Sequence, residues 1–305
     1  MKIGYYPGCT LKSKARNLDE SALQSLNALG VEAVELERWN CCGAVYNLAD
    51  DDLVHFLAPV RDLIRARQQG YDRLLTLCSM CYNTLARANQ LVRQDEVKRK
   101  TLNDFMDEEP DYAGEVEVVH LLPFLRDEVG WDRLREAVKR PLTGMNVAPY
   151  YGCTLTRPRE VSIDGVEPGL SPQVFEEFIA ALGATPVPFA QAETCCGSYN
   201  IISAPEAALD KVAGIVADAG AGGAHVLALS CPLCEYNLGR RQPEALAQQA
   251  AAAEGDTEAP GPLPVFYFTQ LLALALGLPP AAVRLDLSPE ASRRFLQEQG
   301  LLVSA

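Results

Sequence analysis

The cysteines of this chain form two sets of five, and each set contains an adjacent pair followed by glycine. The pairs are Cys41-Cys42-Gly43 and Cys195-Cys196-Gly197. In each set, one cysteine precedes the pair inside a Gly-Cys-Thr-Leu segment, and a Cys-x-x-Cys motif follows it. All ten cysteines of the sequence belong to this pattern: Cys9, Cys41, Cys42, Cys78 and Cys81, then Cys153, Cys195, Cys196, Cys231 and Cys234.

Clustered cysteines of this kind indicate a metal centre or redox chemistry. Five thiols per set exceed the four that tetrahedral zinc requires, and an adjacent pair offers two thiolates from one point of the chain. This favours a group with several metal atoms, namely an iron–sulfur cluster. Glycine beside the cysteines lets the backbone approach a bulky inorganic group. Structural zinc in one half remains an alternative, because Cys-x-x-Cys suits zinc.

A disulfide framework is the other alternative. The first residues run into Cys9 without the apolar stretch of a secretory signal. We therefore expect a cytoplasmic protein, and in that compartment thiols are kept reduced. A helix beginning at Cys78 or Cys231 would also lower the thiol pKa and favour the thiolate ligand.

The composition excludes several classes of function. The chain has 305 residues, which suits two domains, and 48% of them are hydrophobic, enough for real cores. Its formal net charge of -13 argues against binding to nucleic acid or to an anionic membrane surface. No run of residues approaches the roughly 18 apolar positions of a membrane span.

Strands and helices are predicted to alternate along the chain, and the order repeats once. Helix 19–29 is expected to be capped by Asn17 or Asp19, and segments 156–172 and 247–262 are expected to be loops or surface connections. A charged helical extension is expected over 93–111. The predicted strands cover 2–6, 31–36, 73–77 and 115–119, then 145–150, 185–189, 225–229 and 263–268. The other predicted helices cover 51–69, the residues after 78, those after 121, 172–182, 206–219, those after 232, and 270–276.

This alternation predicts an α/β fold with two similar, duplicated domains. Each domain would be a small, mostly parallel sheet with flanking helices, and a pseudo-twofold axis would relate the two. We place the domains at residues 1–144 and 145–305. Every cysteine group comes just after a predicted strand, and the carboxyl ends of parallel strands share one edge of a sheet. The five thiols of each domain should therefore converge.

Three segments give the chain a resemblance to a known family. They are the Tyr-x-Gly-Cys-Thr-Leu start, the stretch from Trp39 to Ala44 and the stretch from Val265 to Leu272. The sequence resembles the CCG-domain family, and most closely the B subunit of heterodisulfide reductase. The resemblance implies two non-cubane [4Fe-4S] clusters, each held by one of the two cysteine sets. One cluster and one zinc ion is the alternative.

The resemblance also implies a reaction. The chain would be the catalytic subunit of an oxidoreductase complex and would reductively cleave a disulfide, or form one in reverse. Electrons would come from a ferredoxin-like iron–sulfur subunit, which a flavin subunit would supply. The alternatives are a non-catalytic electron-transfer subunit, as in CCG-containing lactate, glycolate or succinate oxidoreductases, and thiol–disulfide chemistry on a sulfur-carrier substrate. The glycine-rich residues 220–223 end a predicted helix, so they do not indicate a dinucleotide-binding loop.

Four further side chains are candidates for substrate binding. Lys12 and Arg157, with Arg159 close by, follow the first cysteine of each set and could hold an anionic disulfide, or they are solvated surface charges. His120 and Gln270 occupy matching places before Leu-Leu in the two halves. They could bond to a cluster sulfide or to substrate, or they make structural hydrogen bonds.

A Tyr-Asn pair follows the glycine of each cysteine set. These pairs, at residues 46–47 and 199–200, would pack around the clusters or belong to the scaffold.

Overall fold

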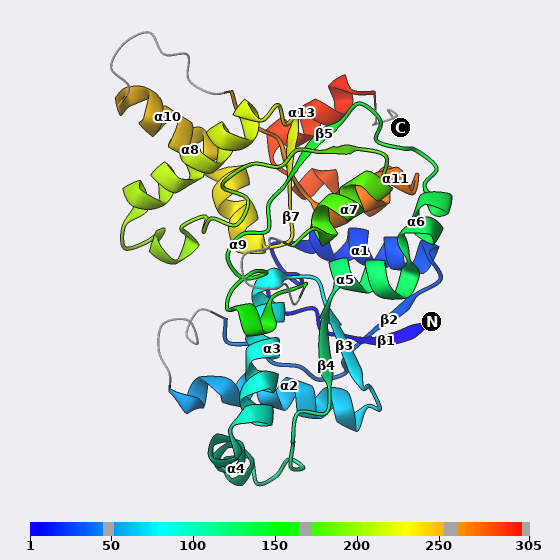
Figure 1. Cartoon of the computed structure of the whole chain (residues 1–305), viewed down its shortest axis with the longest axis vertical. Helices are drawn as coiled ribbons and strands as arrows, with labels where there is room; N and C mark the ends of the chain where they lie inside the picture. The colour runs from blue at the N-terminus through cyan, green and yellow to red at the C-terminus, as the bar shows by residue number, and fades with distance from the viewer. Residues whose placement is uncertain (45–51, 165–171, 253–260, 301–305) are drawn as a thin grey trace.

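The computed structural model describes residues 1–44, 52–164, 172–252 and 261–300. Its core consists of two four-stranded sheets in which every strand pairing is parallel. The first sheet has the order β2-β1-β3-β4, and the second has the order β6-β5-β7-β8. Corresponding strands occupy corresponding places, so the sheets are copies of one arrangement. Figure 1 shows them as separate lobes joined by helices between them.

The strands of each sheet are short and largely buried. The first sheet is built from β1 (Lys2–Tyr5), β2 (Glu32–Glu35), β3 (Arg73–Thr76) and β4 (Glu117–His120). The second is built from β5 (Asn146–Pro149), β6 (Thr185–Pro186), β7 (Val226–Leu229) and β8 (Val265–Tyr267). β6 is the shortest because Pro186 and Pro188 lack the backbone N–H that a longer ladder needs.

Helices connect consecutive strands, as parallel pairing requires. The first half contains α1 (Arg16–Ala28), a 3-10 turn (Leu53–Phe56), α2 (Leu57–Gln68), α3 (Ser79–Gln94), α4 (Glu96–Phe105), α5 (Leu121–Phe124), a π-turn (Leu125–Val129) and α6 (Trp131–Ala137). The second half contains a 3-10 turn (Arg159–Val161), α7 (Val174–Ala181), α8 (Pro205–Ala221), α9 (Pro232–Glu235), a π-turn (Tyr236–Arg240), α10 (Gln242–Ala252), α11 (Phe268–Ala275), α12 (Pro280–Val283) and α13 (Glu290–Glu298).

The two halves pack on one another through equivalent helices. α1, which follows β1, packs on α11, and α7, which follows β5, packs on α5. Because α5 and α11 each follow the last strand of their sheet, the two contacts are related by exchange of the halves, as a pseudo-twofold arrangement requires. At the α1–α11 contact, the buried Ser21 hydroxyl donates to Thr269 Oγ1 at 2.7 Å. Figure 1 shows α1 beside α7 and α11 at the border of the lobes.

The fold predicted from the sequence is confirmed, whereas several local predictions are wrong. α1 begins at Arg16 after Ala15, without a side-chain cap, so Asn17 and Asp19 lie inside the helix. Part of the expected surface connection 247–262 belongs to α10, and residues 253–260 lie outside the described residues. The domain boundary at residue 144 stays a prediction.

Candidate metal centre

In the first half, the cysteine groups follow the three strands β2, β1 and β3, which are neighbours in the sheet. Their thiols form a row. The Sγ atoms of Cys9 and Cys41 lie 3.5 Å apart, and Cys42 donates to Cys81 at 3.7 Å. The thiols of Cys41 and Cys42 lie close enough to influence each other's pKa, as do those of Cys78 and Cys81. Side chains that are far apart in the sequence are thus brought together at one sheet edge.

The second half repeats this row. Cys196 donates to Cys234 at 3.5 Å. The thiol of Cys195 lies close to that of Cys153 and raises its pKa, and the thiols of Cys231 and Cys234 likewise influence each other. In both rows the outer cysteines are accessible and the inner ones are buried. An inorganic group held by either row could therefore be reached from its outer end.

The two rows meet at their inner ends. Cys78 and Cys231, the first residues of the two Cys-x-x-Cys motifs, lie close enough across the halves for each thiol to influence the pKa of the other. Each occupies the residue before a helix, α3 or α9. All ten thiols consequently form one continuous chain of contacts through the centre of the molecule.

Two glycines leave room beside the thiols. A Cβ at Gly8 would lie 2.8 Å from Cys81 Sγ, and one at Gly152 would lie 3.6 Å from Cys234 Sγ. Both have positive φ, +73° and +65°. The all-sulfur donor set and these recesses fit an iron–sulfur group. Within the described residues, no three His, Cys, Asp or Glu side chains form a preformed site for a metal ion.

Two buried tyrosines position the adjacent cysteine pairs. The Tyr6 hydroxyl donates to Asn40 O at 2.7 Å, and the Tyr150 hydroxyl donates to Thr194 O at 2.6 Å. Each carbonyl belongs to the residue just before the pair. Both side chains are at most 1% exposed. The sequence analysis did not assign this role, although a tyrosine three residues before the first cysteine of both sets is a visible signal.

The candidate cations Lys12 and Arg157 lie in different environments. Lys12 Nζ is paired with Glu35 at 2.6 Å and with Asp19 at 3.3 Å. Arg157 donates to the carbonyl of Glu193 and lines a cavity of about 530 Å³ beside Cys195. Arg159 lines the same cavity. Arg157 and Arg159 therefore lie at a cavity beside the second cysteine row, whereas Lys12 is paired with carboxylates.

His120 and Gln270 are buried and bonded to protein atoms. His120 Nε2 lies 3.0 Å from Leu77 O, and its Nδ1 accepts from Leu122 N at 3.3 Å. Gln270 donates to Val283 O and to Ser288 Oγ, both at 2.9 Å. These contacts favour the structural alternative, and substrate binding by either side chain stays a prediction.

The expected equivalence of His120 and Gln270 is wrong. His120 ends β4, whereas Gln270 lies within α11. Tyr267 takes the place of His120, because each is the last residue of the final strand in its sheet and precedes a helix. The shared Leu-Leu motif had suggested an alignment three residues away from the structural one.

Of the two Tyr-Asn pairs, residues 46–47 lie outside the described residues. Tyr199, of the second pair, reaches across the halves and donates to Met80 Sδ at 3.4 Å. Met80 lies between the two cysteines of the first Cys-x-x-Cys motif. This tyrosine therefore packs where the two thiol rows meet.

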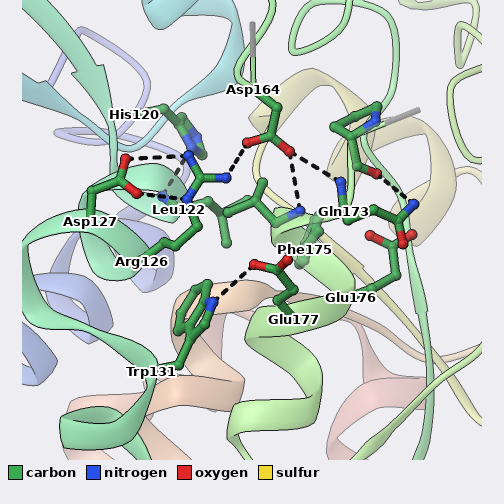
Figure 2. A network of polar contacts seen from close by, with 12 residues as sticks. His120, Leu122, Arg126, Asp127, Trp131, Asp164, Gln173, Phe175, Glu176 and Glu177 are labelled. Carbon is green, nitrogen blue, oxygen red and sulfur yellow. Dashed lines mark hydrogen bonds and ion pairs between the residues drawn. The ribbon is translucent and has the colours of Figure 1, made fainter. Parts of the chain in front are cut away.

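A polar network fixes the segment that follows Cys153 (Figure 2). Arg126 pairs with Asp164 at 2.5 Å, and Asp164 accepts from the backbone N–H of Gln173 and Val174 at the start of α7. Asn83 of α3 donates to Thr154 O and Arg157 O at 2.9 and 2.7 Å. Residues of the first half thus hold this segment of the second half in place.

The duplicated sheets and cysteine rows define a class of cysteine-rich α/β proteins. The family model described as the cysteine-rich domain (CCG) matches this chain twice, over residues 3–86 and 147–239. The chain belongs to this family.

Named relatives match nearly the whole chain. It is 33% identical to the 8-methylmenaquinol:fumarate reductase membrane anchor subunit of Wolinella succinogenes, with 91% of this chain and 93% of that protein covered. It is 28% identical to the B subunit of a CoB-CoM heterodisulfide reductase of Methanosarcina acetivorans, over 97% and 96% of the two chains. A protein of Archaeoglobus profundus, named as similar to the heterodisulfide reductase B subunit, is also 28% identical, over 93% of each.

A solved structure shares the fold. It is the crystal structure of a hypothetical protein from Helicobacter pylori, with a TM-score of 0.70 and 14% sequence identity. The match covers 93% of this chain and 51% of that chain. In the part of the chain that the structure describes, no helix has the length and apolar character needed to cross a membrane.

Proposed function

We propose that this chain is an iron–sulfur subunit of a multi-subunit reductase and that it cleaves a disulfide reductively between two non-cubane [4Fe-4S] clusters. The observation that carries the proposal is the Cys78–Cys231 contact, which joins two complete five-cysteine sets. Splitting one sulfur–sulfur bond from both sides requires two such sets close together. The relatives named after the B subunit of heterodisulfide reductase support the same assignment.

Each cysteine set would hold one cluster, and a bound cluster would supply single electrons and iron that binds sulfur. The chain's own residues contribute position. Gly8 and Gly152 leave room next to Cys81 and Cys234. Tyr6 and Tyr150 fix the backbone before the adjacent pairs.

The overall reaction consumes two electrons and two protons. The sulfur–sulfur bond breaks, each sulfur gains one electron and one proton, and two thiols leave. A ferredoxin-like iron–sulfur subunit would deliver the electrons one at a time, and a flavin subunit would supply that subunit in turn. The relatives are named as subunits of reductases, which supports a complex of this kind. The reverse reaction would oxidise thiols, and we propose that the complex works in the cytoplasm.

Anaerobic reconstitution with iron and sulfide tests the cluster assignment. We expect about four irons and four sulfides per cysteine set, and oxidation of a reduced viologen dye that depends on an added disulfide. The Cys196→Ser variant should lose the second cluster and the disulfide-dependent activity. Disulfide reduction that persists after the second cluster is lost would contradict the two-sided mechanism.

A second candidate function is electron transfer without a substrate of its own, with either two clusters or one cluster and one zinc ion. The 33% identity to a subunit of a menaquinol:fumarate reductase favours it. Under this function, the loaded protein would accept and pass on electrons, and no disulfide tested would increase dye oxidation. A metal analysis that finds zinc in one cysteine set would also support this candidate.

A further inference from the structure

The cavity beside Cys195 carries positive charge in an otherwise acidic protein. Among the described residues, three cations, Arg157, Arg159 and Lys211, line it together with one carboxylate, that of Glu193. The whole chain has a formal net charge of -13. A hollow in which three cations face one carboxylate will therefore concentrate anions that the rest of the surface repels.

Arg159 and Lys211 make no ion pair with a carboxylate in the part of the chain that the structure describes. The Lys211 side chain lies over the second cysteine set, because a Cβ at Gly197 would lie 3.4 Å from Lys211 Cδ. These charges are thus close to the thiol row and available to a ligand.

The matching cation of the first half lies in a different environment. Lys12, the cation that follows the first cysteine of that half, is neutralised by Asp19 and Glu35. The cations at these matching positions of the two cysteine sets therefore differ in their pairing. Cations without a carboxylate partner at the second set are consistent with a ligand that binds at that set.

The segment that supplies Arg157 and Arg159 is held firmly. The Arg126–Asp164 ion pair and the Asn83 side chain anchor it to the first half, as Figure 2 shows for Asp164. Arg157 is further held by its bond to the Glu193 carbonyl. Arg157 is therefore prearranged, which lowers the entropic cost of binding.

We propose that this hollow is an anion-binding pocket that holds the oxyanion group of a small organic substrate beside Cys195, with Arg159 and Lys211 as its main contacts. The volume of about 530 Å³ lies in the range of small-molecule sites and exceeds what a single inorganic anion would fill. A carboxylate, sulfonate or phosphate end group would each satisfy the cations. The assignment of this pocket as a substrate site rests on the proposed reductase function. The binding of an anion in the pocket does not depend on that function.

Calorimetric titration of the reconstituted protein with malonate, and with its neutral analogue malonamide, tests the proposal. We expect malonate to bind, malonamide to bind at least tenfold more weakly, and Arg159→Gln and Lys211→Gln each to weaken malonate binding about tenfold. Parallel titrations with methanesulfonate and phosphate would identify the preferred oxyanion. The matched control is Lys100→Gln on α4, an exposed lysine away from the cavity, which should bind malonate as the unmodified protein does.

Three results would each overturn the proposal. They are equal affinity for malonate and malonamide, unchanged malonate affinity in the Arg159→Gln/Lys211→Gln double variant, and a loss of malonate affinity in Lys100→Gln equal to that in the cavity variants. Because neither cation makes an ion pair with a described residue, both variants should melt at the temperature of the unmodified protein, and binding can be compared on folded chains. Malonate binding that persists without any disulfide-dependent dye oxidation would refute the reductase function and leave the anion site standing.

Discussion

The thiols of Cys78 and Cys231 lie close together across the two halves of the chain, and each influences the pKa of the other. Each residue immediately precedes a helix, so the contact joins two equivalent points of the duplicated fold. It places the inner ends of both cysteine rows in one buried region. Any groups held by the two rows would be neighbours, and electrons could pass between them without leaving the protein.

Serine variants of the inner pair residues should each remove one cluster only. Cys42→Ser belongs to the first set and Cys196→Ser to the second, and both thiols are buried equally, at 2% exposure. We expect the iron content to fall to about half in each variant, because the remaining set keeps its own thiolates. Iron, sulfide and zinc analysis of the purified anaerobic proteins measures this.

The double variant Cys42→Ser/Cys196→Ser supplies the control and should contain almost no iron. If either single variant already loses all of its iron, the two sets do not load independently. If one variant loses zinc and keeps its iron, the alternative of one cluster and one zinc ion is correct.

Gly8→Ala should disturb the first cysteine set more than an equivalent change elsewhere. Its φ of +73° makes any Cβ unfavourable by about 1–2 kcal/mol, and that Cβ would also lie 2.8 Å from Cys81 Sγ. Gly70→Ala is the matched control, because Gly70 has a φ of +79° and open space at its Cβ position. We expect Gly8→Ala to lose iron from the first set and Gly70→Ala to keep it. Equal iron contents in both variants would show that the recess at Gly8 is not needed.

The fold could be predicted because local and global signals agree. Strands at β3 and β7 are apolar runs that end at a cysteine motif, and glycines with positive φ, such as Gly30 and Gly183, end the helices before β2 and β6. The start of α1 was misplaced because Asp19 resembles a cap, although it lies inside the helix and accepts from the Tyr5 hydroxyl at 2.5 Å. A buried pairing of this kind has no local signature.

The candidate site could be predicted only in part. The cysteine pattern indicated which thiols would converge, since each group follows a strand. The contact between Cys78 and Cys231 depends on how the two halves pack, which no spacing within one half reveals. Lys12 and Arg157 differ because of a tertiary contact within the first half: Glu35, on strand β2, neutralises Lys12.

Removing the Tyr6 or Tyr150 hydroxyl should destabilise the loop that carries the adjacent cysteine pair. Tyr6→Phe leaves Asn40 O without its donor in a partly buried place, and Tyr150→Phe does the same to Thr194 O. We expect a cost of about 1–3 kcal/mol for each change in the free energy of unfolding. Denaturant unfolding of the cluster-free chain measures it.

Tyr71→Phe is the control for these two variants. In the described part of the chain the Tyr71 hydroxyl has no hydrogen-bond partner, although its ring packs against Gly4. The substitution should change the free energy of unfolding by less than about 0.5 kcal/mol. A cost at Tyr71 equal to that at Tyr6 would mean that the carbonyl contacts contribute nothing specific.

We expect the titration of His120 to lower the stability of the folded protein in mild acid. Burial lowers its pKa from 6.5 to about 3, and the ring makes a hydrogen bond to Leu77 O. Between these values the unfolded chain binds a proton that the folded chain does not, so stability falls as the pH decreases below 6.5. We expect this group alone to cost roughly 3 kcal/mol between pH 6.5 and 4.5.

The difference in the free energy of unfolding between the unmodified protein and His120→Gln, measured against pH, separates the contribution of His120 from that of the carboxylates. Glutamine can still donate to Leu77 O but does not titrate, so the variant's free energy of unfolding should decrease less steeply with acidification. His225→Gln, a change at an exposed histidine that accepts from Asn146 N, is the comparison for loss of a histidine in general. If His120→Gln and the unmodified protein lose stability in parallel from pH 6.5 to 4.5, His120 is not held neutral by its burial. Denaturant midpoints at several pH values, measured on the cluster-free chain, decide between these outcomes.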